Sequence, residues 1–223
     1  MSTPENTTPS APRPSVTRDL INVGVFTALY FVILAILGQL GALVPITQVL
    51  APFYLPIVCG IPFMLFLTRV KRFGMITAMG WIIGLLLLLT GMPLTVLPIA
   101  FVLAVAADLV ARTGGYKRWW SLVAAYAIFS EILIGTVVPL FFQRDAFLAR
   151  RLERQGEVWT NQIEALTPSW MFFVMIVMLA VGAVIGAYLG RAIFRKHYRY
   201  LAPAGLDSSI ASPQPQDPSG TNA

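Results

Sequence analysis

Two long stretches without a charged side chain constrain this chain more than any other feature. Residues 20–68 form a run of 49 positions without Asp, Glu, Lys or Arg, and residues 75–107 form another of 33. A helix needs about 20 apolar residues to cross a hydrocarbon core about 30 Å thick, so the first run is long enough for two membrane spans, and the second for two that extend a few residues past its ends. The runs are uniformly apolar, whereas strands of a membrane barrel alternate between apolar and polar residues. Lipid is therefore the expected solvent for most of this chain.

We predict an all-α, polytopic membrane protein that forms a bundle of six transmembrane helices. The expected spans are residues 19–40, 43–67, 73–90, 93–112, 121–142 and 169–190. Only 12% of the residues are charged, against about a quarter in soluble domains, which agrees with this class. The membrane domain is expected over residues 18–200, with an external loop at 143–168. Residues 1–17 and 201–223, rich in Ser, Thr and Pro, are expected to be disordered cytoplasmic tails.

The distribution of Lys and Arg predicts the orientation. Counted at the span ends, 12 of the 16 basic residues fall on the side that holds both chain ends. Basic residues accumulate on the cytoplasmic side of membrane proteins, so both termini are expected in the cytoplasm and the protein in the cell membrane. The net charge of +6 then reflects topology. We expect no nucleic-acid binding, because the basic residues are scattered among span ends and do not gather on one face.

The common catalytic motifs are absent from the sequence. It contains no G-x-x-x-x-G-K-[ST] phosphate loop, no H-E-x-x-H and no G-x-S-x-G. Its single histidine, His197, and its single cysteine, Cys59, cannot form a cluster of metal ligands. We therefore expect neither enzymatic activity nor ATP hydrolysis by this chain, and no metal or cofactor.

Glu131 is the one acidic residue near the middle of an expected span. A charge there is costly, so such residues usually face the bundle interior or a wet cavity and serve a function. Glu131 is then a ligand acceptor, a cation partner or a proton site, unless it is a protonated structural residue held by hydrogen bonds. Asp108, near the end of its span, is expected to be structural and to pair with Arg112 one turn later.

The external loop holds residues that suit a small-molecule site. Its first half is predicted to be an amphipathic helix that caps the outer mouth of the bundle. Trp159, Asn161 and Trp170 offer ring faces for stacking and an amide for hydrogen bonding. Both tryptophans are equally suited to anchoring at the membrane interface, where this residue type is enriched.

Small residues recur at helical spacing on three of the expected spans. They are Gly24, Ala28, Ala35 and Gly38 on the first, Gly80 and Gly84 on the third, and Gly182, Gly186 and Gly190 on the sixth. Close packing of small residues is a main way in which helices associate in lipid. Each strip contacts either a neighbouring helix of the same chain or a partner protein, and spacing alone favours contact within the chain.

Short motifs then follow one another in a specific order. They are RDLI at residues 18–21, GVFTALY at 24–30, TRVKRFGM at 68–75, RKHY at 195–198 and a later Ala204-Gly205. This pattern resembles the MptD-like (Trep_Strep) family of S components of energy-coupling factor (ECF) transporters. The resemblance runs from about Arg18 to Gly205, and it departs from the family at Tyr198, where a Phe and a shorter gap before Ala-Gly are expected.

The resemblance implies a substrate-binding subunit of an importer. Such a subunit captures a vitamin-like micronutrient outside the cell and docks on a transmembrane coupling subunit powered by two separate ATPase subunits. It implies docking through the strip of Gly24, Ala28 and Ala35. It also implies a ligand pocket near the outer surface, among the later helices. The candidate ligand residues are Glu131, Trp159, Asn161 and Trp170, followed by Gln39, Gln48 and Thr90.

The residues themselves are compatible with two other functions. The chain could be a stand-alone secondary transporter or channel that uses Glu131 as its proton or cation site. It could also be a membrane-anchored assembly or regulatory protein without a ligand. The identity of the substrate is not specified by the sequence, because an acid, two tryptophans and several amides suit many heterocycles.

Overall fold

The computed structural model describes residues 16–69 and 71–201, and this part of the chain is helical without strands. Its elements are α1 (Val16–Leu43), α2 (Pro45–Arg69), α3 (Met75–Leu89), α4 (Val96–Thr113), α5 (Trp119–Ser130), the 3₁₀ turn η1 (Glu131–Leu133), α6 (Ile134–Phe142), α7 (Arg144–Gln155), α8 (Glu157–Leu166) and α9 (Met171–Leu201). Most of the two expected tails, and the Ala204-Gly205 pair, lie outside the described residues.

Five of the six expected spans are helices long and apolar enough to cross a membrane. They are α1, α2, α4, the continuous stretch from α5 to α6, and α9. The remaining one, α3, is apolar but has only 15 residues, or about 22 Å at 1.5 Å per residue, which is less than the hydrocarbon core. It is shorter than the expected 73–90 because Gly74 and Gly91, with φ of 92° and 86°, lie in the left-handed region that ends a helix.

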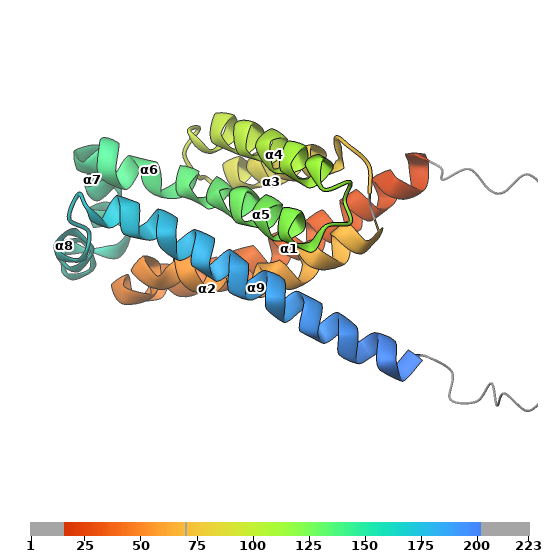
Figure 1. Ribbon diagram of the computed structural model, residues 1–223. Coiled ribbons are helices and arrows are strands. Elements are labelled where there is room, and N and C mark those ends of the chain that lie inside the picture. The colour runs from red at the N-terminus through yellow and green to blue at the C-terminus, as the bar shows by residue number, and fades with distance from the viewer. Residues whose placement is uncertain (1–15, 70, 202–223) are drawn as a thin grey trace, which may run out of the picture.

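The spanning helices run alongside one another, and the remaining elements gather at the two ends (Figure 1). One end carries α7 and α8, and we call it the cap end. The opposite end carries the start of α1, the turns that follow α2 and α4, and the last turns of α9. We call it the basic end, because most of the Lys and Arg residues fall there.

Glycine brings α2 and α9 into backbone contact. A Cβ atom on Gly60 of α2 would lie 2.6 Å from the backbone carbonyl carbon of Gly186, and Cβ atoms on Gly182 and Gly186 would collide with the α2 carbonyl oxygens of Phe53 and Pro56. Only hydrogen fits at these positions. The expectation that the small residues of the last span pack within the chain is therefore confirmed.

The small residues of α3 also pack within the chain. A Cβ on Gly84 would lie 2.9 Å from the Cβ of Ala100, and one on Gly80 would collide with Ala104, so α3 and α4 approach closely. At the centre of the bundle the Phe63 ring lies 4.7 Å, centroid to centroid, from the ring of Phe129 on α5. Because α4 also packs against α5, these contacts join α2, α3, α4, α5 and α9 into one packed unit.

Candidate functional site

The span that contains Glu131 is interrupted at that residue. Glu131 opens the 3₁₀ turn between α5 and α6, and the turn packs against α4 and α9. The Glu131 side chain is half-buried, while the neighbouring Ile132 and Leu133 are buried. Within the described part of the chain, its carboxyl group has neither a hydrogen bond nor an ion pair. A 3₁₀ interruption within a helix often marks a functional position, and an unpaired acid in a span does so more strongly.

A proline contributes to the irregular backbone of this span. Pro139 lacks the N–H that would bond to the carbonyl oxygen of Gly135. The hydroxyl of Thr95, at the start of α4, donates to that oxygen over 3.1 Å. The backbone acceptor that Pro139 leaves without a donor is thus satisfied by a neighbouring helix, as lipid requires.

The external loop folds into two helices. The predicted amphipathic helix is confirmed as α7, whereas α8 was not predicted from the sequence. Gly156, with φ of 83°, separates them. Arg144 at the start of α7 donates to the carbonyl oxygens of Thr167 and Glu164, over 2.8 and 2.9 Å, and its Nε lies 3.8 Å from the Glu164 carboxylate. This residue fixes the end of α8 to the start of α7 and closes the cap.

The interior of the cap contains an arginine between two aromatic rings. The guanidinium carbon of Arg151 lies 5.1 Å from the ring centroid of Phe147 and 5.4 Å from that of Trp159. Trp159 is only 7% exposed, and its indole N–H has no acceptor among the residues that the structure describes. Burial lowers the pKa of Arg151 below its ordinary value, and the charge of Arg154 lowers it further. The group thus brings together two aromatic rings, a cation and an indole N–H donor.

The structure places the other predicted ligand residues at the surface or away from this group. Asn161, Gln39 and Thr90 are exposed, and the Thr90 hydroxyl donates to the carbonyl oxygen of Leu87 in its own helix. Gln48 is half-buried near the start of α2. Trp170 is 63% exposed, as an interface anchor would be.

The predicted ligand residues do not form one site. Trp159 and Asn161 lie on α8 and Trp170 directly precedes α9, whereas Gln39 lies near the end of α1, Gln48 near the start of α2 and Thr90 directly after α3 (Figure 1). Glu131 precedes the last residue of α6 by 11 positions, or about 17 Å along a helix axis. Arg151, which the sequence analysis did not single out, lies over the rings of both Phe147 on α7 and Trp159 on α8. Its place on the helix face with Phe147, one turn away, was the signal available in the sequence.

Asp108 is structural, as expected, but the prediction that it pairs with Arg112 is wrong. The buried carboxylate accepts hydrogen bonds from the backbone N–H groups of Gly74 and Thr77, over 2.8 and 3.2 Å, and from the Thr77 hydroxyl over 3.0 Å. It also accepts one from the Tyr116 hydroxyl over 2.6 Å. Burial and this hydrogen bond raise the pKa of Tyr116. Arg112 is exposed and stacks over Phe73, because an arginine at the end of a span extends toward water.

The small residues of α1 face outward. Gly24 and Ala28 are exposed, Ala35 is half-buried, and a Cβ added to Gly24 would meet no atom within 4 Å. The opposite face of α1, with Val23 and Tyr30, packs into the bundle. The prediction from spacing that these strips contact a helix of the same chain is therefore wrong for Gly24 and Ala28.

One comparison with known proteins identifies related sequences. The model of a family described as hypothetical bacterial integral membrane protein (Trep_Strep) matches residues 17–199. No curated protein and no solved structure matches the chain.

Proposed function

Because this chain belongs to the Trep_Strep family of hypothetical bacterial integral membrane proteins, we propose that it is the substrate-binding (S) subunit of an ECF-type importer. It captures a vitamin-like micronutrient outside the cell and docks on a transmembrane coupling subunit powered by two ATPase subunits. The observation that carries the proposal is the outward-facing strip of Gly24 and Ala28 on α1. The chain has several membrane spans and no nucleotide-binding motif, as expected of a subunit that depends on separate ATPases.

The strip has the geometry of a docking surface for another helix. Its flanking residues on the lipid-facing side are bulky, among them Ile21 and Val25, which are 61% and 59% exposed. Two small residues one turn apart make a shallow groove between them. Lipid chains gain little from such a groove, whereas a partner helix packs closely into it.

In this proposal the basic end lies in the cytoplasm, where the ATPase subunits work. The supporting observation is the excess of Lys and Arg at that end. A reporter protein that works only in the cytoplasm should then be active when it is fused after Tyr200, and a reporter that works only in the periplasm should be inactive there. A periplasmic signal from that fusion would contradict the orientation.

Substrate capture is assigned to the cap. The stack of Phe147, Arg151 and Trp159 suits a planar ligand that carries an acidic or carbonyl group, because rings, cation and indole donor lie next to one another. Because Arg144 holds α7 and α8 together, the two helices would move as one unit when the cap opens or closes.

Docking is tested by co-purification from the native bacterial host. The wild-type protein should bring down a coupling subunit and two ATPases, and Ala28→Leu should lose them while remaining folded. Ala124→Leu is the matched control, since it adds the same side chain at an exposed alanine of α5. Equal recovery of partners with both variants, or no partners with the wild type, would contradict the docking role of α1.

Capture is tested by mass spectrometry of small molecules retained by the purified protein. A retained ligand should be lost on Arg151→Gln and kept on Arg150→Gln, because Arg150 lies on the same helix but is exposed. Trp159→Ala should also lose it. If the ligand persists in both Arg151→Gln and Trp159→Ala, the cap does not bind it.

One observation favours a second function, a stand-alone secondary transporter or channel. It is Glu131, which has no hydrogen bond or ion pair with any described residue and lies at the 3₁₀ interruption of a span. Under this alternative, proteoliposomes without ATPases should take up substrate, and Glu131→Gln should abolish the uptake. Glu157→Gln, in the exposed start of α8, serves as the control. Absence of uptake by the wild type without ATPases would exclude this alternative and agree with the S subunit.

A further inference from the structure

A cavity of about 340 Å³ opens at the basic end, away from the cap. It lies between the end of α2, the turn before α5, the start of α5 and the later part of α9. Its apolar surface is formed by Met64, Leu67 and Leu122. Three cations, Lys71, Lys117 and Arg191, also line it, and we call them the cavity cations.

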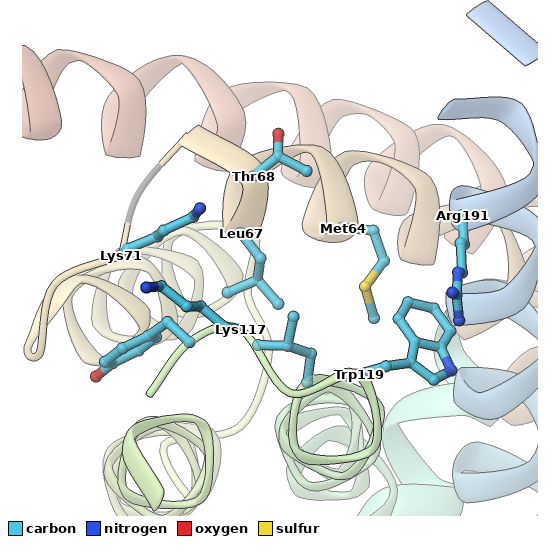
Figure 2. A pocket seen from close by; sticks show the side chains of 9 residues that line it. Met64, Leu67, Thr68, Lys71, Lys117, Trp119 and Arg191 are labelled. Carbon is cyan, nitrogen blue, oxygen red and sulfur yellow. The ribbon is translucent and has the colours of Figure 1, made fainter. Parts of the chain in front are cut away.

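The cavity cations approach from two sides. Figure 2 shows the amines of Lys71 and Lys117 at one end of the cavity, and Arg191 next to Trp119 at the other, with Met64 and Leu67 between them. The guanidinium carbon of Arg191 lies 4.4 Å from the ring centroid of Trp119, which holds the arginine in place. An anion in the cavity would therefore lie between cations on two sides.

No described carboxylate neutralises the cavity cations. The described ion pairs are Arg72 with Asp19 and Arg144 with Glu164, and none of the three takes part. The nearby hydroxyls are occupied as donors, since Thr68 donates to the carbonyl oxygen of Leu65 and Tyr116 to Asp108. None of the three cavity cations therefore has an ion-pair partner within the described part of the chain.

The indole N–H of Trp119 is a further donor in need of an acceptor. It is buried and has no hydrogen-bond partner among the described residues. A buried donor without a partner costs free energy, so an acceptor from outside the protein would stabilise the site. Figure 2 shows this nitrogen on the side of the ring next to the Arg191 guanidinium. Two kinds of donor therefore meet at one edge of the cavity.

The position of the cavity relative to the membrane points to the source of the anion. Arg191 is the first charged residue of α9 and follows 20 uncharged residues, and Leu67 lies two residues before Arg69, the one charged residue of α2. The cavity is thus at the depth of lipid headgroups, and its apolar surface would lie beside acyl chains. Basic pockets between spanning helices bind anionic headgroups by this combination.

We propose that this cavity binds the phosphate group of an anionic phospholipid, which the cavity cations and the Trp119 indole hold at the basic end of the bundle. Arginine and lysine both recognise phosphate oxygens through charged hydrogen bonds. The site is distinct from the ligand-binding cap and does not depend on the importer function.

The test is native mass spectrometry of the full-length protein in uncharged detergent, titrated with phosphatidylglycerol, phosphatidylcholine or inorganic phosphate. The test variant carries Lys71→Gln, Lys117→Gln and Arg191→Gln. The control variant carries Arg69→Gln, Arg112→Gln and Arg118→Gln, three cations of the same end that do not line the cavity. Both lose three positive charges, so they differ only in where the charge was.

The wild type and the control should bind phosphatidylglycerol, and the test variant should bind it at least about tenfold more weakly, because charged hydrogen bonds are lost. Trp119→Phe keeps a ring under Arg191 and should weaken binding by a smaller factor, even if the triple variant fails to fold. Equal loss in test and control variants would overturn the proposal. Preference for phosphatidylcholine, or binding of inorganic phosphate without phosphatidylglycerol, would overturn the assignment to an anionic lipid.

Discussion

The small residues of α9 and those of α1 share a four-residue spacing but meet opposite surroundings. On α9, Gly182 and Gly186 lie against the backbone of α2. On α1, Gly24 and Ala28 face outward, and nothing lies within 4 Å of a Cβ built on Gly24. The spacing of small residues therefore predicts that one side of a helix lacks bulky side chains. It does not predict what packs against that side.

The difference originates in the partner helix. α2 offers its own glycine, Gly60, where α9 crosses it, so two backbones meet. α1 instead presents Val23, Thr27 and Tyr30 to the bundle, and these side chains are buried. A large inner face leaves the small residues on the outside of α1. A strip used for folding and one available for docking are thus separated by the residues around them.

The largest expected effect is the loss of the fold on Gly186→Leu. The side chain would occupy the space of the α2 carbonyl oxygens of Pro56 and Ile57, and the two backbones would have to separate. No monodisperse protein should elute from size-exclusion chromatography in detergent. Ala28→Leu, in contrast, should elute as the wild type. A well-folded Gly186→Leu protein would remove the distinction between the strips.

A smaller change at the same crossing should still be costly. Gly186→Ala adds one methyl group against backbone atoms, which cannot rotate away, and should lower the free energy of unfolding by about 3 kcal/mol. Gly190→Ala should cost less, because the atoms nearest to its Cβ, the Met64 Cβ at 3.1 Å and the Gly60 carbonyl oxygen at 3.3 Å, lie farther away than the backbone atoms that face Gly186. Unfolding in mixed micelles with increasing SDS measures both. Equal losses would show that backbone contact is not the cause.

A substitution at the crossing of α3 and α4 should cause an intermediate loss of stability, which a second substitution partly reverses. Gly80→Ala brings a methyl group onto that of Ala104 and should cost about 1 to 2 kcal/mol. Ala104→Gly in the same chain removes the opposing methyl, so a double-mutant cycle should give a favourable coupling of about 1 kcal/mol. The measurement is the same unfolding titration on the four proteins of the cycle. Additive losses would contradict direct contact between the two methyl groups.

The smallest effect is expected on α1. Gly24→Ala fills open space on the lipid-facing side, so the free energy of unfolding should change by no more than about 0.5 kcal/mol. A loss as large as that of Gly186→Ala would mean that Gly24 packs within the chain after all. The comparison between the strips would then fail.

Much of the fold follows from local sequence properties. The charge-free runs predicted the apolar helices and their order, and the helix α7 followed from its amphipathic pattern. The length of α3 did not follow, because it depends on the left-handed conformations of Gly74 and Gly91. The partners of Asp108 were also missed, since Gly74, Thr77 and Tyr116 reach it from other segments.

The candidate site was predictable only in part. Trp159 was singled out by residue type, and the structure places it in the cap beside Arg151, which was not. Trp170 was singled out by the same reasoning and is exposed. Residue type alone does not separate a tryptophan in a cap from one at a membrane interface, because both roles use the same ring.

By itself the sequence determined the solvent of this protein and the helical form of its spans, since hydropathy belongs to each segment and every backbone group in lipid needs an internal partner. Only the tertiary structure decided which glycines are buried, which side chains meet in the cap, and which cations surround one cavity. These relations join residues far apart in the chain. They depend on how each helix is rotated toward its neighbours, and no local pattern encodes that rotation.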